Sequence, residues 1–246
     1  MNVTLREGER IEDLQYKGLR LIQRDGSFRF GTDSVLLAGF ARIGSKEKAV
    51  DLCAGCGVIA ILLQGRTGAE LTAVEIDPTA CSMARRSVEM NGQPIEIVEA
   101  DMRTAHELLG LGRFDAAVCN PPYYPAGGGQ VSRKGEGEYE GAATHDVLCA
   151  LTDVAASAAK LLKFGGKLFM CCPASRLAEA FAALAAEKLE PKRMRLVAST
   201  PDKAPYLALI EAKKGAAPGL VIEKTLTVAN ADGSYTEEVD RIYHRI

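Results

Sequence analysis

The sequence predicts an α/β fold with a mostly parallel sheet and helices on both of its faces. From Ala49 onward, short apolar runs of strand length alternate with segments of helical length, which is typical of such sheets. The first of these runs passes into a helix through a glycine-rich turn at 51–57. The 246 residues, 47% of them hydrophobic and 25% charged, can bury one large core.

The N-terminal region precedes this alternation and is expected to differ from it. We expect residues 1–12 to be irregular and polar. Leu14–Tyr16 and Leu19–Ile22 are separated by a Lys-Gly pair, and this pattern predicts a short β-hairpin. Thr32 or Asp33 is the expected N-cap of the helix that follows.

The remaining elements follow from apolar runs, turn residues and caps. The strands expected after residue 48 are Val50–Cys53, Leu71–Ile76, Ile95–Val98, Phe114–Cys119, Gly166–Cys172, Arg193–Ala198, Tyr206–Ala212 and Leu220–Val228. The helices expected are about 33–42, Val58–Leu63, Pro78–Met90, Arg103–Leu109, Asp146–Leu162 and Ala174–Leu189. We expect 193–198 and 206–212 to pair antiparallel, and the chain to end in a polar tail.

Composition and charge disfavour several classes of function. The formal net charge of −2 gives no general attraction to polyanions, so a nucleic acid would need a local basic face. No apolar run has the length of a membrane span and Met1–Arg10 is charged, so we expect a cytoplasmic protein without a signal peptide. The seven cysteines indicate reduced thiols, and the C-x-x-C pair Cys53 and Cys56 has no second pair to complete a metal site.

The turn at 51–57 reads Asp-Leu-Cys-Ala-Gly-Cys-Gly and predicts a cofactor site. Gly55 and Gly57 allow a ligand to approach the backbone closely. Glu75 ends the next strand about twenty residues later, where an acidic side chain accepts hydrogen bonds from the two hydroxyls of a ribose. Dinucleotides and S-adenosylmethionine both use this layout. The third spaced glycine of G-x-G-x-x-G is missing, which disfavours a nicotinamide cofactor.

Two further residues, Asp101 and Met102, follow the third strand of the alternation. Asp101 has two open interpretations, as the acceptor of an adenine amino group or as the N-cap of the helix after it. Met102 is placed to pack on an adenine ring.

The segment Asn120-Pro121-Pro122-Tyr123 stands where a buried strand must stop. Two prolines donate no N–H and fix φ, so they make a stiff, extended corner. Such a corner presents the Asn120 side-chain oxygen and the Pro121 carbonyl beside the ring of Tyr123, with Tyr124 as a second stacking candidate. Two acceptors and an aromatic face suit a planar base with an exocyclic amino group.

A stretch without apolar period, Tyr124–Ala143, follows this corner. A loop of this length inside a compact domain is usually a functional lid or a disordered segment. The basic residues that we consider for phosphate contacts are Arg20, Arg24, Arg29, Arg133, Lys134, Lys188, Lys192, Arg193 and Arg195.

With these motifs in place, the chain resembles class I S-adenosylmethionine-dependent methyltransferases that carry an NPPY motif and methylate amino groups. The resemblance runs from residue 26 to about 212, and the segment 14–37 is similar to bacterial tRNA1(Val) adenine-N6 methyltransferases. It implies a Rossmann-like fold with a seven-stranded, mostly parallel sheet and an antiparallel terminal strand. Cys53 and Cys56 depart from the family, which often has Gly or Thr there.

The resemblance also implies the chemistry: transfer of a methyl group from S-adenosylmethionine to the N6 amino group of an adenine in RNA, most simply the tRNA adenine next to the anticodon. The catalytic residues it implies are Asn120, Pro121, Pro122 and Tyr123. The cofactor-binding residues it implies are Gly31, Thr32, Asp33, Asp51, Gly55, Gly57, Glu75, Asp101, Met102 and Asn120. No metal is expected, because the sulfonium methyl is already a strong electrophile. Neither a membrane nor an obligate protein partner is expected.

Alternatives remain within and outside this class. The same acceptors would serve methylation of an rRNA or DNA adenine or of a protein glutamine amide, and a non-catalytic module that binds RNA and cofactor is also open. The expected regions are an N-terminal hairpin extension at 1–30, the methyltransferase domain at 31–213, and a C-terminal strand with a polar tail at 214–246.

Overall fold

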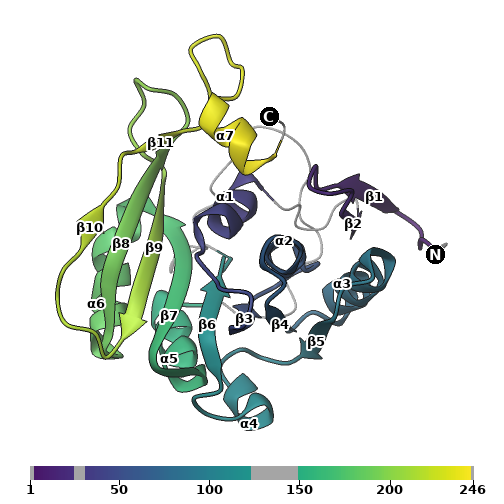
Figure 1. The fold of residues 1–246 in the computed structure, drawn as a ribbon, viewed down its shortest axis with the longest axis horizontal. Helices are drawn as coiled ribbons and strands as arrows, with labels where there is room; N and C mark the ends of the chain where they lie inside the picture. Colours follow the sequence, from purple (N-terminus) through teal and green to yellow (C-terminus); the bar gives the residue numbers. More distant parts are fainter. Residues whose placement is uncertain (1–2, 25–30, 123–148, 245–246) are drawn as a thin grey trace.

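The computed structural model describes residues 3–24, 31–122 and 149–244. Its helices are α1 (Thr32–Phe40), α2 (Val58–Thr67), α3 (Pro78–Asn91), α4 (Ala105–Leu109), α5 (Leu151–Leu161), α6 (Leu177–Ala186) and α7 (Glu237–Ile242). None of the described helices combines the length and the apolar character that crossing a bilayer requires. One large sheet runs through the molecule between two groups of helices (Figure 1).

The strands of this sheet confirm the predicted alternation. They are β3 (Lys48–Leu52), β4 (Glu70–Glu75), β5 (Ile95–Glu99), β6 (Phe114–Cys119), β7 (Leu162–Pro173), β8 (Leu189–Ala198), β9 (Leu207–Lys214), β10 (Val221–Ile222) and β11 (Leu226–Thr227). Their order is β10-β8-β9-β7-β6-β3-β4-β5, and β11 also pairs with β8. β9 is antiparallel to both of its neighbours, as expected, and the other pairs are parallel.

The described sheet has nine strands rather than the expected seven. The difference comes from β10 and β11, which have two residues each. The single strand expected over Leu220–Val228 was wrong, because the chain leaves the edge of β8 between these two short pairings.

β3 lies at the point where the order of strands reverses. The chain continues from β3 to β4 and β5 on one side, and then crosses to β6 and β7 on the other side. In open α/β sheets, ligands bind outside the carboxyl ends of the strands at such a point. The fold therefore places the site where β3 and β6 end.

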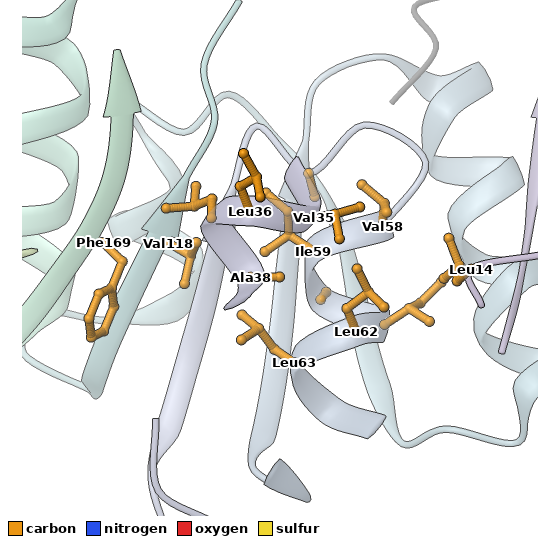
Figure 2. Packing of buried hydrophobic residues seen from close by; sticks show 14 of the residues in the cluster. Leu14, Val35, Leu36, Ala38, Val58, Ile59, Leu62, Leu63, Val118 and Phe169 are labelled. Atoms are coloured by element: carbon orange, nitrogen blue, oxygen red, sulfur yellow. The ribbon is translucent and has the colours of Figure 1, made fainter. Parts of the chain in front are cut away.

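Two hydrophobic cores lie on the opposite faces of the sheet. One contains side chains of α1, α2 and α3, and the other contains side chains of α4, α5 and α6. Figure 2 shows the first core, where Val35 and Leu36 of α1 lie beside Val58 and Ile59 of α2. Because α1 is buried along most of its length, its first turn is held firmly beside the strand ends.

The N-terminal hairpin exists, but its strands differ from the prediction. β1 (Glu9–Asp13) pairs antiparallel with β2 (Arg20–Arg24), so residues 9–12 are not irregular and Leu14–Tyr16 belongs to the connection. The hairpin packs against α3, where the Ile22 N–H donates to Ser87 Oγ at 2.8 Å. The guanidinium of Arg86 binds both carboxylate oxygens of Glu9 at 2.6 Å and lowers the pKa of Glu9 to about 2.

The C-terminal segment is part of the same packing and is not only a tail. β10 and β11 extend the large sheet, and α7 lies against α1 (Figure 1). The helix α7 was missed, although Thr236 is a regular N-cap whose hydroxyl accepts from the Val239 N–H. The helix expected over Ala174–Leu189 is a 3-10 turn at Ala174–Arg176 followed by α6. The division of the chain at residues 30 and 213 stays a prediction.

Candidate active site

The turn between β3 and α2 uses backbone that favours glycine. Gly55 and Gly57 have φ angles of 55° and 89°, in the left-handed region. A Cβ at Gly57 would lie 3.4 Å from the Cβ of Ala84 in α3, whereas a Cβ at Gly55 would meet nothing within 4 Å. Cys53 also has a positive φ, of 60°, which is uncommon for a residue with a side chain. The turn is therefore packed at Gly57 and open to a ligand at Gly55.

Glu75, the last residue of β4, holds this turn through its carboxylate. Oε2 accepts from the Gly55 N–H at 2.7 Å, and Oε1 accepts from the N–H groups of Ile76 and Asp77 at 2.9 Å each. A carboxylate offers about four lone-pair positions, so three backbone bonds do not exhaust its capacity. Glu75 fixes the loop and keeps room to accept from a ligand hydroxyl.

A small cavity of about 40 Å³ opens beside Glu75. Its walls are Cys53, Val74, Glu75, Ile76, Ala100, Asp101, Met102, Arg103 and Cys149. Met102 is buried, and its Sδ lies 3.5 Å from the Sγ of Cys53. Apolar walls with a few fixed polar groups are typical of small-molecule sites.

Asp101 was expected to accept from an adenine or to cap a helix. Its Oδ1 accepts from the Arg103 N–H at 2.9 Å, and the Arg103 guanidinium binds both carboxylate oxygens at 2.5–3.0 Å. This side-chain contact with Arg103 holds the pKa of the Asp101 carboxyl below its usual range. α4 begins at Ala105 with Thr104 as N-cap, so Asp101 caps the turn before the helix. The expected helix N-cap at Asp101 was therefore wrong. Asp101 also lines the cavity, and its contact with an adenine amino group stays a prediction.

Asp51 is fully buried beneath the glycine turn. Its Oδ2 accepts from the Ala60 N–H in the first turn of α2 at 3.2 Å, and its Oδ1 has no hydrogen-bond partner among the described residues. Burial, and to a smaller extent the charge of Glu75, raises the pKa of Asp51 to about 8. The side chain of Asp51 accepts a hydrogen bond from the first turn of α2 and so stabilises the start of that helix. Contact of Asp51 with a cofactor stays a prediction.

Asn120 follows β6 directly and lies between β7 and α1. Because the β6–β7 register pairs Cys119 with Met170, the next residues, Asn120 and Cys171, come side by side. The Cys171 thiol donates to Asn120 Oδ1 at a sulfur–oxygen distance of 3.1 Å. Asn120 Nδ2 donates to Ser34 Oγ at 2.9 Å. Both ends of the amide are therefore held by the protein.

The prolyl corner and the glycine turn follow the ends of two neighbouring parallel strands, and these strands end at paired residues. Leu52, the last residue of β3, is paired with Cys119, the last residue of β6. Pro121 is buried and Pro122 half-buried, so this part of the corner is packed into the fold. Tyr123, the expected stacking residue, lies outside the described residues, as do Tyr124 and the rest of the predicted loop.

Gly31, Thr32 and Asp33 lie at the start of α1. Gly31 is the N-cap, in extended backbone, so the expected cap at Thr32 or Asp33 was wrong. The hydroxyl of Tyr206, just before β9, donates to Asp33 Oδ1 at 3.2 Å. None of the three is among the described residues that line the cavity at Glu75, and their contact with the methionine end of a cofactor stays a prediction.

Among the residues at the site without a predicted site role are Ser34, Cys171 and Cys149. Ser34 adjoins the segment 31–33 that the sequence did indicate. The contact of Cys171 with Asn120 can be predicted only when the register of β6 on β7 is known. Hydrogen bonding to Cys53, together with burial, raises the pKa of the Cys149 thiol, so the thiol is protonated at neutral pH.

The basic residues of β8 are engaged within the protein. Arg193 is buried and bonded to Glu211 and Glu223, and Arg195 is paired with Glu238. The Lys192 ammonium donates to a backbone carbonyl at Ala217. A role of these residues in phosphate binding stays a prediction.

The turn, the acid and the cavity together fit an adenosine-bearing cofactor. Gly55 leaves open space for close approach, Glu75 is placed for ribose hydroxyls, and Met102 offers an apolar wall. Among the residues that the structure describes, no three His, Cys, Asp or Glu side chains converge on a metal position.

The family model for the methyltransferase small domain matches this chain over residues 27–134. The matched segment includes the glycine turn, Glu75, Asp101 and the prolyl corner.

Several relatives align with most of the chain. The tRNA1(Val) (adenine(37)-N6)-methyltransferase of Porphyromonas gingivalis (strain W83) is 29% identical over 238 residues, which cover 92% of this chain and 91% of that protein. The protein of the same name from Shewanella sp. (strain MR-4) is 27% identical over 212 residues, with 85% and 87% covered. A third, from Shewanella amazonensis, is 39% identical over 98 residues, which are 39% of this chain and 42% of that protein.

Solved structures of several methyltransferases share the fold of this chain. A predicted O-methyltransferase of Agrobacterium tumefaciens has a TM-score of 0.68 at 24% identity and covers 86% of this chain and 95% of its own. A 16S rRNA N2 G1207 methyltransferase of T. thermophilus has a TM-score of 0.58 at 20% identity, with 86% and 52% covered. This likeness confirms the predicted Rossmann-like class I methyltransferase fold.

Proposed function

We propose that this chain transfers a methyl group from S-adenosylmethionine to the N6 amino group of an adenine in RNA, and that the substrate is the adenine beside the anticodon of a tRNA. The observation that carries the proposal is the rigid corner at Asn120, which leaves β6 beside the glycine turn that ends β3. The relatives named tRNA1(Val) (adenine(37)-N6)-methyltransferase, which align over most of the chain, support the choice of substrate.

The cavity beside β4 is the proposed cofactor site. Glu75 accepts from the ribose hydroxyls, Met102 packs on the adenine, and Asp101 accepts from its amino group while Arg103 keeps it ionised. Gly55 and Gly57 let the rest of the cofactor pass close to the backbone. When bound, S-adenosylmethionine supplies a methyl group on a positively charged sulfur, which is electrophilic without further activation.

The corner at 120–123 is the proposed base site. Asn120 Oδ1 and the Pro121 carbonyl accept the two N6 hydrogens, which orients the nitrogen lone pair toward the methyl carbon. Tyr123 stacks on a base that has left its own stack. As the bond between N6 and the methyl carbon forms, the methyl–sulfur bond breaks, its electron pair stays on sulfur, and S-adenosylhomocysteine is the leaving group. The two acceptors stabilise the positive charge that develops on the nitrogen, and one N6 proton then passes to water. Rate enhancement then comes from orientation and electrostatics.

The test is methylation of a defined RNA. The purified chain is incubated with radiolabelled S-adenosylmethionine and an unmodified tRNA transcript that has adenine at position 37, followed by digestion and identification of the labelled nucleoside. We expect N6-methyladenosine from this transcript and none from a control with guanine at position 37. Label in another nucleoside, or no label, contradicts the proposal.

Replacement of Asn120 tests the base site itself. Asn120→Ala is expected to lower the rate of methyl transfer by about a hundredfold or more, as loss of one transition-state hydrogen-bonding group does. The dissociation constant of S-adenosylmethionine should stay nearly unchanged, because Asn120 acts mainly on the base. A wild-type rate in this variant removes Asn120 from the reaction.

A further inference from the structure

The amide of Asn120 is bonded at both ends by elements that are distant in the sequence. Ser34 belongs to α1 and lies 86 residues before Asn120, while Cys171 belongs to β7 and lies 51 residues after it. Asn120 itself follows β6 directly, so three separate elements meet at one side chain. A surface asparagine without these partners would change rotamers freely.

Both partners are shielded from water. Ser34 is 3% exposed and Cys171 is fully buried. Water therefore competes little for their hydrogen bonds, which are stronger in a low-dielectric interior than at the surface. The two contacts bias the position of Asn120 more than equivalent contacts in solvent would.

The two partners also distinguish the two ends of the amide. A serine hydroxyl accepts readily from an N–H, whereas a thiol is a weak donor and a weak acceptor. With Nδ2 on Ser34, the oxygen faces the thiol, which occupies one of its two lone pairs. The second lone pair is the one that the proposed function assigns to the adenine amino group. The reversed amide would place an N–H donor where that acceptor is needed.

We propose that Ser34 and Cys171 are positioning residues for methyl transfer, which hold the Asn120 amide with its oxygen toward the base. This inference rests on the proposed function, because it assigns the role of acceptor to Asn120. Neither residue touches the base or the cofactor in this proposal, and each acts through Asn120. The hydrogen bond from Asn120 to Ser34 is the stronger of the two, and the thiol of Cys171 adds a weaker one to the amide oxygen.

The experiment compares single and double variants in single-turnover methyl transfer to the tRNA transcript with adenine at position 37. Ser34→Ala is expected to lower the rate constant of transfer about tenfold, the upper range for one lost net hydrogen bond. KM for the transcript and the dissociation constant of S-adenosylmethionine should not change. Ser157→Ala is the matched control, since Ser157 is equally buried at 3% exposure but lies in α5 on the other face of the sheet.

The double variant decides whether Ser34 acts through Asn120. In the Asn120→Ala background, Ser34→Ala should cause no further loss, because the side chain that it holds is gone. Cys171→Ala should lower the rate, and Cys171→Ser, which keeps a donor at the same place, should retain it. Thermal unfolding of each variant shows whether a lower transfer rate comes from loss of the folded state. If Cys171→Ala is destabilised, the comparison of Cys171→Ser with the wild type still tests the role of the donor.

The outcomes separate this inference from the proposed function. If the wild type does not methylate the transcript, or if Asn120→Ala keeps the wild-type rate, the proposed function fails and the positioning role fails with it. If Asn120→Ala is strongly impaired but Ser34→Ala keeps the wild-type rate, only the positioning role is overturned. A loss from Ser34→Ala that persists in the Asn120→Ala background also overturns that role alone.

Discussion

Replacing Arg193 by alanine should destabilise the fold strongly, although Arg193 looks in the sequence like one more basic surface residue. Its guanidinium is 2.8 Å from Glu211, 3.2 Å from Glu223 and 2.7 Å from the carbonyl oxygen of Phe40, and it lies 3.7 Å from the centre of the Phe40 ring. Arg193 is 8% exposed, and the side chain of Glu211 is 14% exposed. Removing the arginine would leave a largely buried carboxylate without its cation.

The magnitude follows from this burial. Breaking a buried ion pair by removing one partner costs about 3–5 kcal/mol. For a chain of this size each kcal/mol lowers the melting temperature by about 2–4 °C, so Arg193→Ala should melt roughly 6–20 °C below the wild type. Urea unfolding followed by circular dichroism measures the free energy directly.

Arg195 provides the matched control on the same strand. Its partner Glu238 is 51% exposed, so no buried carboxylate is left behind, and Arg195→Ala should cost about 1–2 kcal/mol for the weak ion pair and the hydrogen bond to the Lys224 carbonyl. If Arg193→Ala is as stable as Arg195→Ala and instead weakens tRNA binding, the ion-pair network is not structural. Arg193 would then be the phosphate contact that the sequence suggested.

Three further predictions concern the site and the C-terminal packing. The pKa of Asp51 is about 8 in the folded state, so between about pH 4 and pH 8 the folded state holds a proton that the unfolded state releases. Over this range the contribution of Asp51 to the free energy of unfolding falls by up to about 1.4 kcal/mol per pH unit. Asp51→Asn should remove this slope in urea unfolding across that range, and an unchanged slope would contradict the assignment. Glu75→Ala should weaken binding of S-adenosylmethionine about ten- to hundredfold by calorimetry, as loss of a charged hydrogen-bond acceptor does, and an unaltered dissociation constant would take Glu75 out of the site. Gly39→Ala should cost about 1–3 kcal/mol because its Cβ would come 2.8 Å from Cγ2 of Ile242 in α7, and Ile242→Ala should recover part of that loss.

Local patterns predicted the elements whose signals lie in adjacent residues. β6 has the predicted bounds because the two prolines must end it and the apolar run defines its start. α3 begins at Pro78 behind its cap Asp77 and ends before Gly92, also from local signals. The sequence also predicted that Glu75, Asp101 and Met102 belong to one cofactor site, and the three residues line the same cavity.

The errors arose where burial or pairing depends on distant residues. Leu14 and Tyr16 are buried, as apolar strand residues would be, but they pack as a connection while the charged segment Glu9–Asp13 forms the strand. The charge of Glu9 is compensated by Arg86, which is 77 residues away. Ser34 and Cys171 meet Asn120 only through the packing of α1 and the register of β7, and no spacing in the sequence encodes that meeting.

The bond between Arg193 and the Phe40 carbonyl has a consequence for biosynthesis. It joins residues 153 positions apart, so α1 emerges from the ribosome long before the strand that anchors its carboxyl end. Until β8 is translated, the carboxyl end of α1 is held by packing with earlier elements such as α2 and β7. A nascent chain halted before this strand would therefore possess the glycine turn and the prolyl corner and still lack a fully anchored α1.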